Sequence, residues 1–175
     1  MTTAYAELPT DLLGLLTLTA TEEGLSGVFM EGHRHGPADR SGWLRDPGPF
    51  RAAAEQLREY LAGERRTFDL DLAPAAGTPF QRRVWGALEA VPYATTTTYG
   101  ALAAGLGAPR AVRAVGAANG RNPLSIVRPC HRVIGAGGAL TGYGGGLDAK
   151  RALLALEARV LAQDAGVAAT ADSPS

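Results

Sequence analysis

The pattern of apolar and polar positions divides the first part of the chain into short strands and one helix. Residues 13–20 are rich in Leu and Thr and favour a strand, and residues 25–30 follow a Glu-Glu-Gly turn and predict its hairpin partner. Residues 50–61 carry apolar side chains at helical spacing. Residues 67–72 alternate and predict another strand, whereas residues 31–48, rich in Gly, Pro and His, predict a loop.

After residues 74–77 the pattern of apolar positions becomes typical of helices. Thr78 is a suitable N-cap and Pro79 a suitable first helical residue. A short helix at 98–103 and a second at 110–119 surround a Gly- and Pro-containing turn, which is the pattern of a helix-turn-helix. Generic helical hairpins have the same pattern, and the second helix offers few base-reading side chains.

A glycine-rich stretch precedes the last predicted helix. Residues 135–146 contain seven glycines, which permit close approaches that a side chain blocks. A flexible linker has this composition too, but the position between two ordered elements favours a loop that closes over a ligand. A final helix is expected at 147–161, and small polar residues predict a disordered tail over 164–175.

These elements predict an α+β or α/β fold in two parts. The first is a small N-terminal α/β domain over 1–73, followed by a linker at 74–77. The second, over 78–163, is a mainly helical domain with the helix-turn-helix and the Gly-rich loop. A chain of 175 residues is long enough to bury a proper core.

Composition narrows the class of protein. Hydrophobic residues make up 46% of the chain and charged residues 19%, as in globular proteins. A single cysteine excludes an internal disulfide and a cysteine-rich zinc site, and it fits a reducing cytoplasm. No apolar stretch approaches the roughly 20 residues that cross a membrane, and no signal peptide is visible. We therefore expect a cytoplasmic protein with no metal and no membrane partner.

The net charge of zero hides an uneven distribution. Residues 81–151 contain nine basic and two acidic side chains, whereas the rest of the chain contains eight basic and fifteen acidic ones. Such asymmetry is a recognised sign of nucleic-acid binding by the basic part.

The only cysteine, Cys130, lies in the run Arg128-Pro129-Cys130-His131-Arg132. Positive neighbours favour the thiolate, which is the reactive form of cysteine. A free cysteine is more often a buried small hydrophobe, and neighbours on a strand point to opposite faces, so His131 need not contact Cys130. This run alone leaves a nucleophile and a core thiol both open.

Several further motifs follow one another along the second part of the chain. They are Phe80-Gln81, Val84-Trp85, Tyr99-Gly100, Arg113-Ala114-Val115-Gly116, Asn119-Gly120-Arg121-Asn122-Pro123, Pro129-Cys130-His131-Arg132-Val133 and Gly142-Tyr143-Gly144-Gly145-Gly146. With these motifs the chain resembles the methylated-DNA–protein-cysteine methyltransferases, the suicide proteins that repair O6-alkylguanine. The match covers 78–157, and the N-terminal part is similar in length and layout, which implies a ribonuclease H-like domain there.

The resemblance implies a mechanism for Cys130. The thiol would take the alkyl group from O6-alkylguanine in DNA, and from O4-alkylthymine, once and irreversibly, with no cofactor. His131 would act as base through a water molecule and Glu157 would orient it, as in other catalytic triads. On sequence alone an exposed helix glutamate is the commoner reading of Glu157. Complete ionisation of a thiol gains only about thirty-fold at pH 7, so positioning must supply the rest.

The resemblance also implies roles in the pocket. Tyr99 would donate a proton to the leaving purine, Lys150 would help near its oxygen, and Asn122 would brace the active-site loop. A core aromatic and an exposed lysine are the ordinary readings of Tyr99 and Lys150. The carbonyls of Cys130 and Val133 would face the guanine amino group, and the loop with Tyr143 and Gly144 would form the pocket wall.

The implied partner is double-stranded DNA, bound through its minor groove by a monomer. The lesion base must leave the stack, and Arg113 would fill the vacated space. Small residues around Arg113 would let the helix lie close to the DNA backbone. The DNA-contacting residues implied are Arg113, Thr98, Ala114, Ala117, Arg121 and Arg110.

Three departures from the family pattern bear on substrate and DNA affinity. Residues 94–98 read Ala-Thr-Thr-Thr-Thr where the family usually has a glycine, an acidic or amide residue and an arginine. Gly144 replaces a serine of some relatives, which removes a possible hydrogen bond to O6 and leaves the range of alkyl groups open. The N-terminal cysteines that bind zinc in some members are absent.

Three other functions fit parts of the sequence. A non-catalytic lesion-binding relative would lack Cys130, and a helix-turn-helix regulator would need base-reading side chains that are sparse here. A cysteine hydrolase would need an oxyanion site, for which the sequence offers no candidate.

Overall fold

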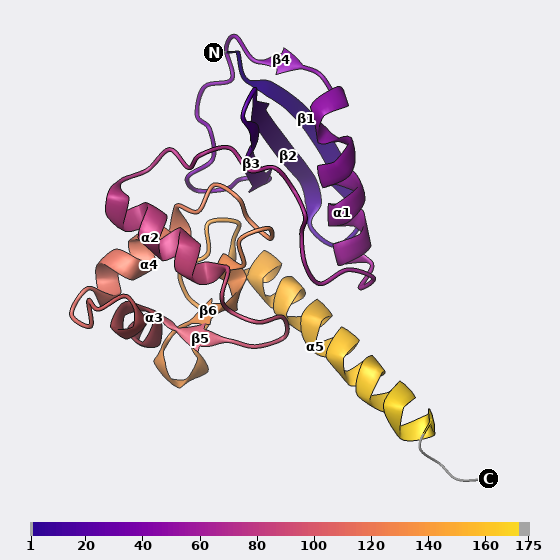
Figure 1. Cartoon of the computed structure of the whole chain (residues 1–175), viewed down its shortest axis with the longest axis vertical. Helices are drawn as coiled ribbons and strands as arrows, with labels where there is room; N and C mark the ends of the chain where they lie inside the picture. Colours follow the sequence, from indigo (N-terminus) through magenta and orange to yellow (C-terminus); the bar gives the residue numbers. More distant parts are fainter. Residues whose placement is uncertain (1, 172–175) are drawn as a thin grey trace.

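The N-terminal part is a four-stranded sheet with one long helix (Figure 1). The computed structural model describes residues 2–171. The strands are β1 (Ala4–Thr10), β2 (Gly14–Thr21), β3 (Gly24–Met30) and β4 (Leu44–Arg45), in the spatial order β3-β2-β1-β4. The first three strands are antiparallel and β4 joins β1 in parallel.

Sequence patterns located the hairpin but not the sheet around it. The predicted strand pair is present as β2 and β3, with a shift of register between Thr19 and Ala20. β1 and the short β4 escaped prediction, β4 because it lies within the predicted loop 31–48. The predicted strand at 67–72 is wrong: this segment touches β3 through a single bridge, from Leu25 to Leu72. Alternation marked its half-buried side chains, but its backbone has no continuous partner.

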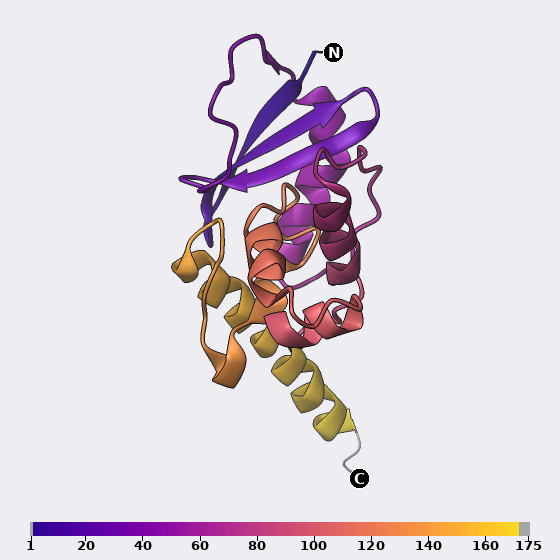
Figure 2. The ribbon, with the colours of Figure 1, turned by 90° about the vertical axis from the view of Figure 1, so that its left-hand side faces the viewer.

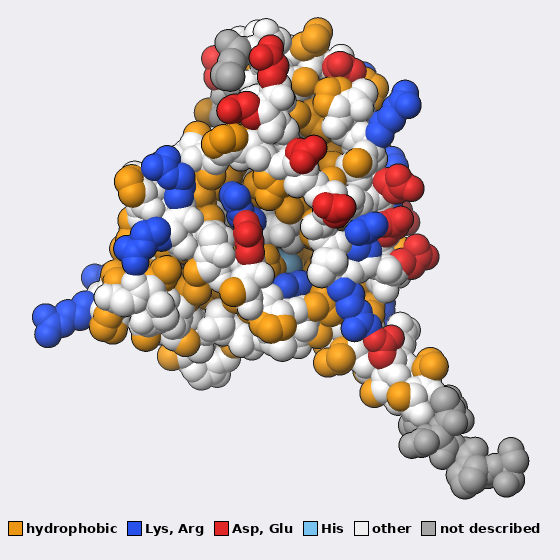
Figure 3. Space-filling view, in the orientation of Figure 1, with side chains coloured by type: hydrophobic (Ala, Val, Ile, Leu, Met, Phe, Trp, Pro, Cys, Tyr) orange, Lys and Arg blue, Asp and Glu red, His pale blue; other side chains and the backbone are white. Residues whose placement is uncertain are grey.

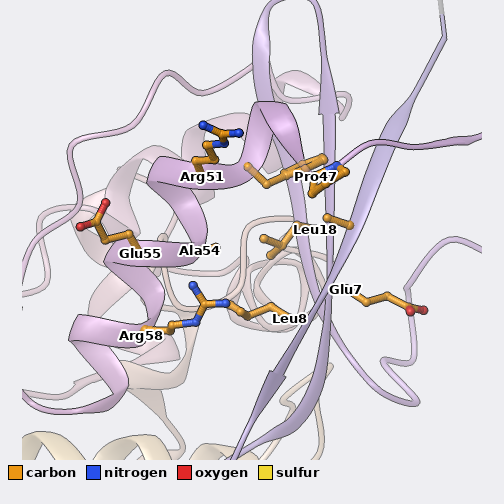
Figure 4. A pocket seen from close by; sticks show the side chains of 10 residues that line it. Glu7, Leu8, Leu18, Pro47, Arg51, Ala54, Glu55 and Arg58 are labelled. Atoms are coloured by element: carbon orange, nitrogen blue, oxygen red, sulfur yellow. The ribbon is translucent and has the colours of Figure 1, made fainter.

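Helix α1 (Arg51–Leu61) follows the 3₁₀ turn η1 (Gly48–Phe50), as the helical spacing predicted. It buries Ala53, Leu57 and Tyr60. An open hollow of about 490 Å³ lies between α1 and the sheet, lined by apolar Leu8 and Leu18 and by charged side chains of the helix (Figure 4). Cys130 is not among its lining residues.

The C-terminal part is mainly helical. It contains α2 (Pro79–Leu88), α3 (Tyr99–Gly105), α4 (Val112–Gly120) and α5 (Leu147–Ala171), with the 3₁₀ turns η2 (Cys130–Arg132) and η3 (Ala136–Gly138). The two-residue strands β5 (Thr97–Thr98) and β6 (Val133–Ile134) pair in parallel. Thr78 caps α2 as predicted, in a reciprocal capping box with Gln81.

The predicted disordered tail at 164–175 is wrong for its first residues, because α5 continues to Ala171. Alanine is the best helix former, and it recurs along this end of the chain. An ion pair between Arg66 and Asp164 also ties the extension to the N-terminal part. Residues 172–175 lie outside the described residues. Figure 1 shows the end of α5 projecting away from the body.

The two parts are joined by backbone pairing at the free edge of β3. The Val28 N–H donates to the Pro123 carbonyl at 2.8 Å, and the Ser125 N–H donates to the Val28 carbonyl at 3.3 Å. Figure 2 shows the sheet lying across one end of the helical part. The loop that leads to Cys130 is therefore fixed to the sheet. Within residues 2–171, no helix combines the length and apolar character that crossing a membrane requires.

Candidate active site

Cys130 begins a buried 3₁₀ turn and does not lie on a strand. Cys130 is only 2% exposed, and its N–H donates to the Arg128 carbonyl at 2.7 Å. The preceding turn contains Ile126 in the left-handed region, at φ 74°. This conformation is strained for a β-branched residue, so the surrounding packing must hold the turn in place.

Two asparagine side chains fix the turn from below. The Asn122 Nδ2 donates to the Cys130 sulfur at 3.0 Å and to the Arg128 carbonyl at 2.9 Å. The Asn119 Nδ2 donates to the Cys130 carbonyl at 3.2 Å. The expected bracing by Asn122 thus has a geometric basis, and a direct contact with the sulfur accompanies it.

The environment of Cys130 corrects the expectation of a thiolate in the free protein. Burial raises the pKa of the thiol, and this outweighs the lowering by the Asn122 hydrogen bond and the Lys150 charge. The flanking arginines face other groups: Arg128 binds Glu89 at 2.9 Å and Arg132 binds Glu157 at 2.8 Å. Adjacency in sequence did not bring their charges to the sulfur.

His131 and Glu157 form a buried pair. The His131 Nε2 and the Glu157 Oε1 are 2.8 Å apart, and neither residue is exposed. Glu157 is therefore not the exposed glutamate of the ordinary reading. Burial alone raises the pKa of Glu157, but hydrogen bonds from His131 and Arg132 lower it to about 2. The carboxylate is ionised at neutral pH.

Further donors surround this carboxylate. Arg132 donates to both oxygens at 2.8–3.1 Å, and the Ala94 N–H donates to Oε2 at 2.9 Å. Ala94 adopts a left-handed φ of 57°, a conformation that favours glycine. Alanine at this position therefore costs backbone strain, while its N–H donates to Glu157.

The other ring nitrogen of His131, Nδ1, makes no hydrogen bond within the described residues, and it is buried. Burial lowers the pKa of His131, against the opposing effect of Glu157, so the ring is neutral at pH 7. With an ionised carboxylate at Nε2, the proton belongs on Nε2, and Nδ1 is the basic atom. Among the described residues, no hydrogen bond joins His131 directly to the Cys130 sulfur.

Lys150 is fully buried, not exposed. Its Nζ donates to the carbonyls of Val133 at 2.5 Å and Thr141 at 2.9 Å, and to the Tyr99 hydroxyl at 3.4 Å. The Tyr99 hydroxyl itself donates to the Thr141 carbonyl at 2.6 Å. Burial lowers the pKa of Lys150 to about 8, while the Cys130 charge opposes this. The structure thus brings Tyr99, Lys150 and the Val133 carbonyl together, and this carbonyl, which was expected to face the guanine amino group, accepts a hydrogen bond from Lys150.

The glycine-rich loop forms one wall of a cleft of about 530 Å³. Helix α4 forms another wall, with Ala117 and Arg121 on this side and Tyr143 and Gly144 on the loop side. Arg34 and His35 of the N-terminal part also line the cleft. A Cβ at Gly144 would lie 2.5 Å from the His33 imidazole and 2.8 Å from the Gly120 carbonyl. Glycine is required at this position because the N-terminal loop packs against it.

Of the residues expected to contact DNA, Ala117 and Arg121 line this cleft. Arg113, Ala114 and Ala117 are exposed on α4, Arg121 caps its C-terminal end, and Arg110 precedes it. The Thr98 hydroxyl is engaged in capping α3, where it accepts from the Ala101 N–H at 3.0 Å. In Figure 3 acidic side chains gather over the N-terminal part and around α1, whereas basic ones project beside α2–α4.

Sequence reasoning missed three residues of the site. Tyr60 donates to Glu157, Asn119 holds the Cys130 carbonyl, and Arg132 neutralises the carboxylate. Tyr60 appeared as one apolar position of a helix, and nothing in its local sequence marks a polar contact. Asn119 was part of a recognised motif, but spacing alone does not show which atom it binds.

Comparison with known proteins gives this arrangement a family. The model of the 6-O-methylguanine DNA methyltransferase DNA-binding domain matches residues 79–159, and that of the ribonuclease-like domain of the same proteins matches residues 4–74. The chain belongs to the methylated-DNA–protein-cysteine methyltransferases. This confirms the family and enzyme class expected from the sequence motifs, and it confirms DNA as a partner.

The relatives are similar over most of their length. The methyltransferase of Mycolicibacterium paratuberculosis is 54% identical over 147 residues, which is 84% of this chain and 88% of that protein. The methyltransferase of Methanosarcina acetivorans is 51% identical over 146 residues, 83% of this chain and 92% of its own. A crystal structure of Mycobacterium tuberculosis OGT in complex with DNA superposes with a TM-score of 0.84 at 48% identity, covering 90% and 94% of the two chains.

Proposed function

We propose that this methyltransferase repairs DNA by moving the alkyl group of O6-alkylguanine, and of O4-alkylthymine, to Cys130 in a single irreversible turnover. The observation that carries this proposal is the placement of the Cys130 sulfur. It lies buried beside an amide donor, next to a neutral His131 whose Nδ1 is open and whose Nε2 is held by Glu157. These contacts support Cys130 as the nucleophile, His131 as the base and Glu157 as the orienting carboxylate.

The raised pKa of the thiol explains why a base is needed. As the lesion enters, the thiol proton passes through a water molecule to the His131 Nδ1, and the sulfur attacks the alkyl carbon. The carbon–oxygen bond breaks, its electron pair goes to the guanine oxygen, and a thioether remains on Cys130. Tyr99 gives a proton to the purine ring, and Lys150, whose Nζ lies 3.4 Å from the Tyr99 hydroxyl oxygen, would neutralise the negative charge that develops.

We propose that α4 enters the minor groove of duplex DNA and that Arg113 takes the place of the flipped base. Exposed alanines on α4 support a close approach to the DNA backbone. The cleft between α4 and the Gly-rich loop would receive the flipped base, although Cys130 is not among the residues that line it in this structure. The protein would act as a monomer in the cytoplasm. The division into domains at 74–77 and the reading of α3 and α4 as a DNA-binding helix-turn-helix remain part of this proposal.

The experiment mixes the protein with an oligonucleotide duplex that carries one O6-methylguanine and maps the tryptic peptides by mass. We expect the peptide with Cys130 to gain one methyl group and the DNA to lose it, with a yield of one methyl group per protein. Cys130→Ala should bind the duplex and transfer nothing. An unmodified Cys130 peptide beside DNA that stays methylated would contradict the proposal and favour a lesion-binding protein without transfer. A parallel O4-methylthymine duplex tests the second substrate.

A further inference from the structure

Glu157 receives one hydrogen bond from outside the C-terminal part. Its other donors, His131, Arg132 and the Ala94 N–H, all follow residue 78. Tyr60 comes from α1 in the N-terminal part, 97 positions earlier in the chain. Its hydroxyl reaches the same oxygen, Oε1, that binds His131. The residue is fully buried.

The direction of these hydrogen bonds is fixed by the charge of Glu157. An ionised carboxylate only accepts, so the single Tyr60 proton points to Oε1. The Tyr60 oxygen then presents its lone pairs to the His131 Nε2, which is 3.3 Å away. Nε2 therefore faces two acceptors, at 2.8 Å and 3.3 Å. Both require that the imidazole proton be on Nε2, which leaves Nδ1 free to accept.

We infer that Tyr60 is a positioning residue for alkyl transfer, whose hydroxyl holds Glu157 and the Nε2–H form of His131 so that Nδ1 is the base. This inference rests on the proposed function. The N-terminal part then influences the reaction through Tyr60. No contact given for the described residues joins that part to the Cys130 sulfur. Tyr60 acts on Glu157, and Glu157 acts on the base.

The competing explanation is that Tyr60 only packs in the core. The neighbouring Tyr93 provides a control that distinguishes packing from positioning of Glu157. Tyr60 lies 5.4 Å from the Phe68 ring and 6.1 Å, edge-on, from the Tyr93 ring, so its bulk also fills the core. The Tyr93 hydroxyl is likewise buried, but it has no hydrogen-bond partner among the described residues. Tyr60→Phe and Tyr93→Phe thus remove the same atoms from two touching rings. Only the first removes a donor from Glu157.

The test measures single-turnover methyl transfer from duplex DNA between about pH 5 and 9 for the wild type and both variants. We expect Tyr60→Phe to slow transfer about tenfold at neutral pH, the size of effect expected for a lost hydrogen bond to a charged group. The acidic limb of its pH–rate profile should move to higher pH, because a carboxylate with one donor fewer raises the pKa of His131. Tyr93→Phe should keep the wild-type rate and profile. Equal rates for all three proteins, or equal losses in both variants with no change of profile, would overturn the inference.

A second measurement needs neither activity nor a folded variant. Nitrogen-15 chemical shifts of His131 in the wild-type protein report which ring nitrogen carries the proton. We expect a proton on Nε2, and a proton on Nδ1 would overturn the role of Tyr60 even if the variant fails to fold. If the wild type transfers no methyl group but has the Nε2–H form, the proposed function fails while the link from Tyr60 to His131 stands.

Discussion

The Cys130 sulfur lies in surroundings that suppress its ionisation. Burial raises its pKa, and the nearest relief comes from the Asn122 amide at 3.0 Å and from the charge of Lys150. The thiol is therefore neutral until a base acts on it. Under the proposed function, His131 and the arrival of substrate therefore control reactivity, rather than a permanently lowered thiol pKa.

Asn122 and Asn119 allow this balance to be tested one residue at a time. We expect Asn122→Ala to raise the pKa of Cys130 further and to slow methyl transfer about tenfold, because the sulfur loses its amide donor. The measurement is the pH dependence of Cys130 alkylation by a small reagent, followed by mass. Asn119→Ala is the control, since Asn119 binds the Cys130 carbonyl and not the sulfur. The same increase in both variants would show that the sulfur contact has no separate effect.

The residue types of the site were readable from the sequence, whereas their surroundings were not. Cys130, His131 and Glu157 were named from motifs, and the structure brings the last two within 2.8 Å. The effect of Arg128 and Arg132 was misjudged, because sequence adjacency does not fix the direction of a side chain. Tyr60 was invisible for another reason: its contact with Glu157 spans 97 residues and depends on how two parts of the chain pack.

At the scale of elements, regular local signals gave the best predictions. α1, α2 and the β2–β3 hairpin follow from periodicity and from the cap at Thr78. The segment 67–72 shows the limit, since alternation indicates which side chains are half-buried and not whether a neighbouring strand exists. The prediction of a disordered tail was wrong because small residues suggested disorder, whereas the alanines among them continue α5.

The predicted role of α4 is tested through Arg113, which is exposed on its surface. Arg113→Ala should slow repair of O6-methylguanine in duplex DNA by at least about tenfold, because nothing then stabilises the vacated stack. Reaction with the free base O6-methylguanine, which needs no flipping, should change less than about twofold. The ratio of the two rates is the measured quantity. An equal loss on both substrates would contradict the role of Arg113 in the duplex.

At the scale of the molecule, one carboxylate binds groups from distant parts of the chain. Glu157 on α5 accepts from Tyr60 of α1, from the Ala94 loop and from the turn after Cys130. A second join is made by the backbone pairing of Val28 with residues 123–125. The N-terminal part thus holds the candidate catalytic groups of the C-terminal part, and its residues Arg34 and His35 also line the cleft between α4 and the Gly-rich loop.

This arrangement predicts how stability depends on pH. Because the pKa of Glu157 falls from 4.5 to about 2 in the folded protein, its stabilising effect is present above pH 4.5 and is lost as the pH falls toward 2. Glu157→Gln should lower the free energy of unfolding by about 3–5 kcal/mol at pH 7, since Arg132 loses its buried partner. Urea unfolding at pH 7, 4 and 3 should show this difference shrink as the solution becomes more acidic. A difference that stays constant across this range would contradict it.

The burial of Cys130 also bears on how long the protein survives before it is used. Under the proposed single-turnover reaction, Cys130 is consumed once, and an oxidant that reaches it first would inactivate the protein. Oxidants attack the thiolate and need access to it, so a neutral thiol with 2% of its residue exposed is protected on both counts. The burial that creates the proposed need for a base at His131 thus also protects the unused protein.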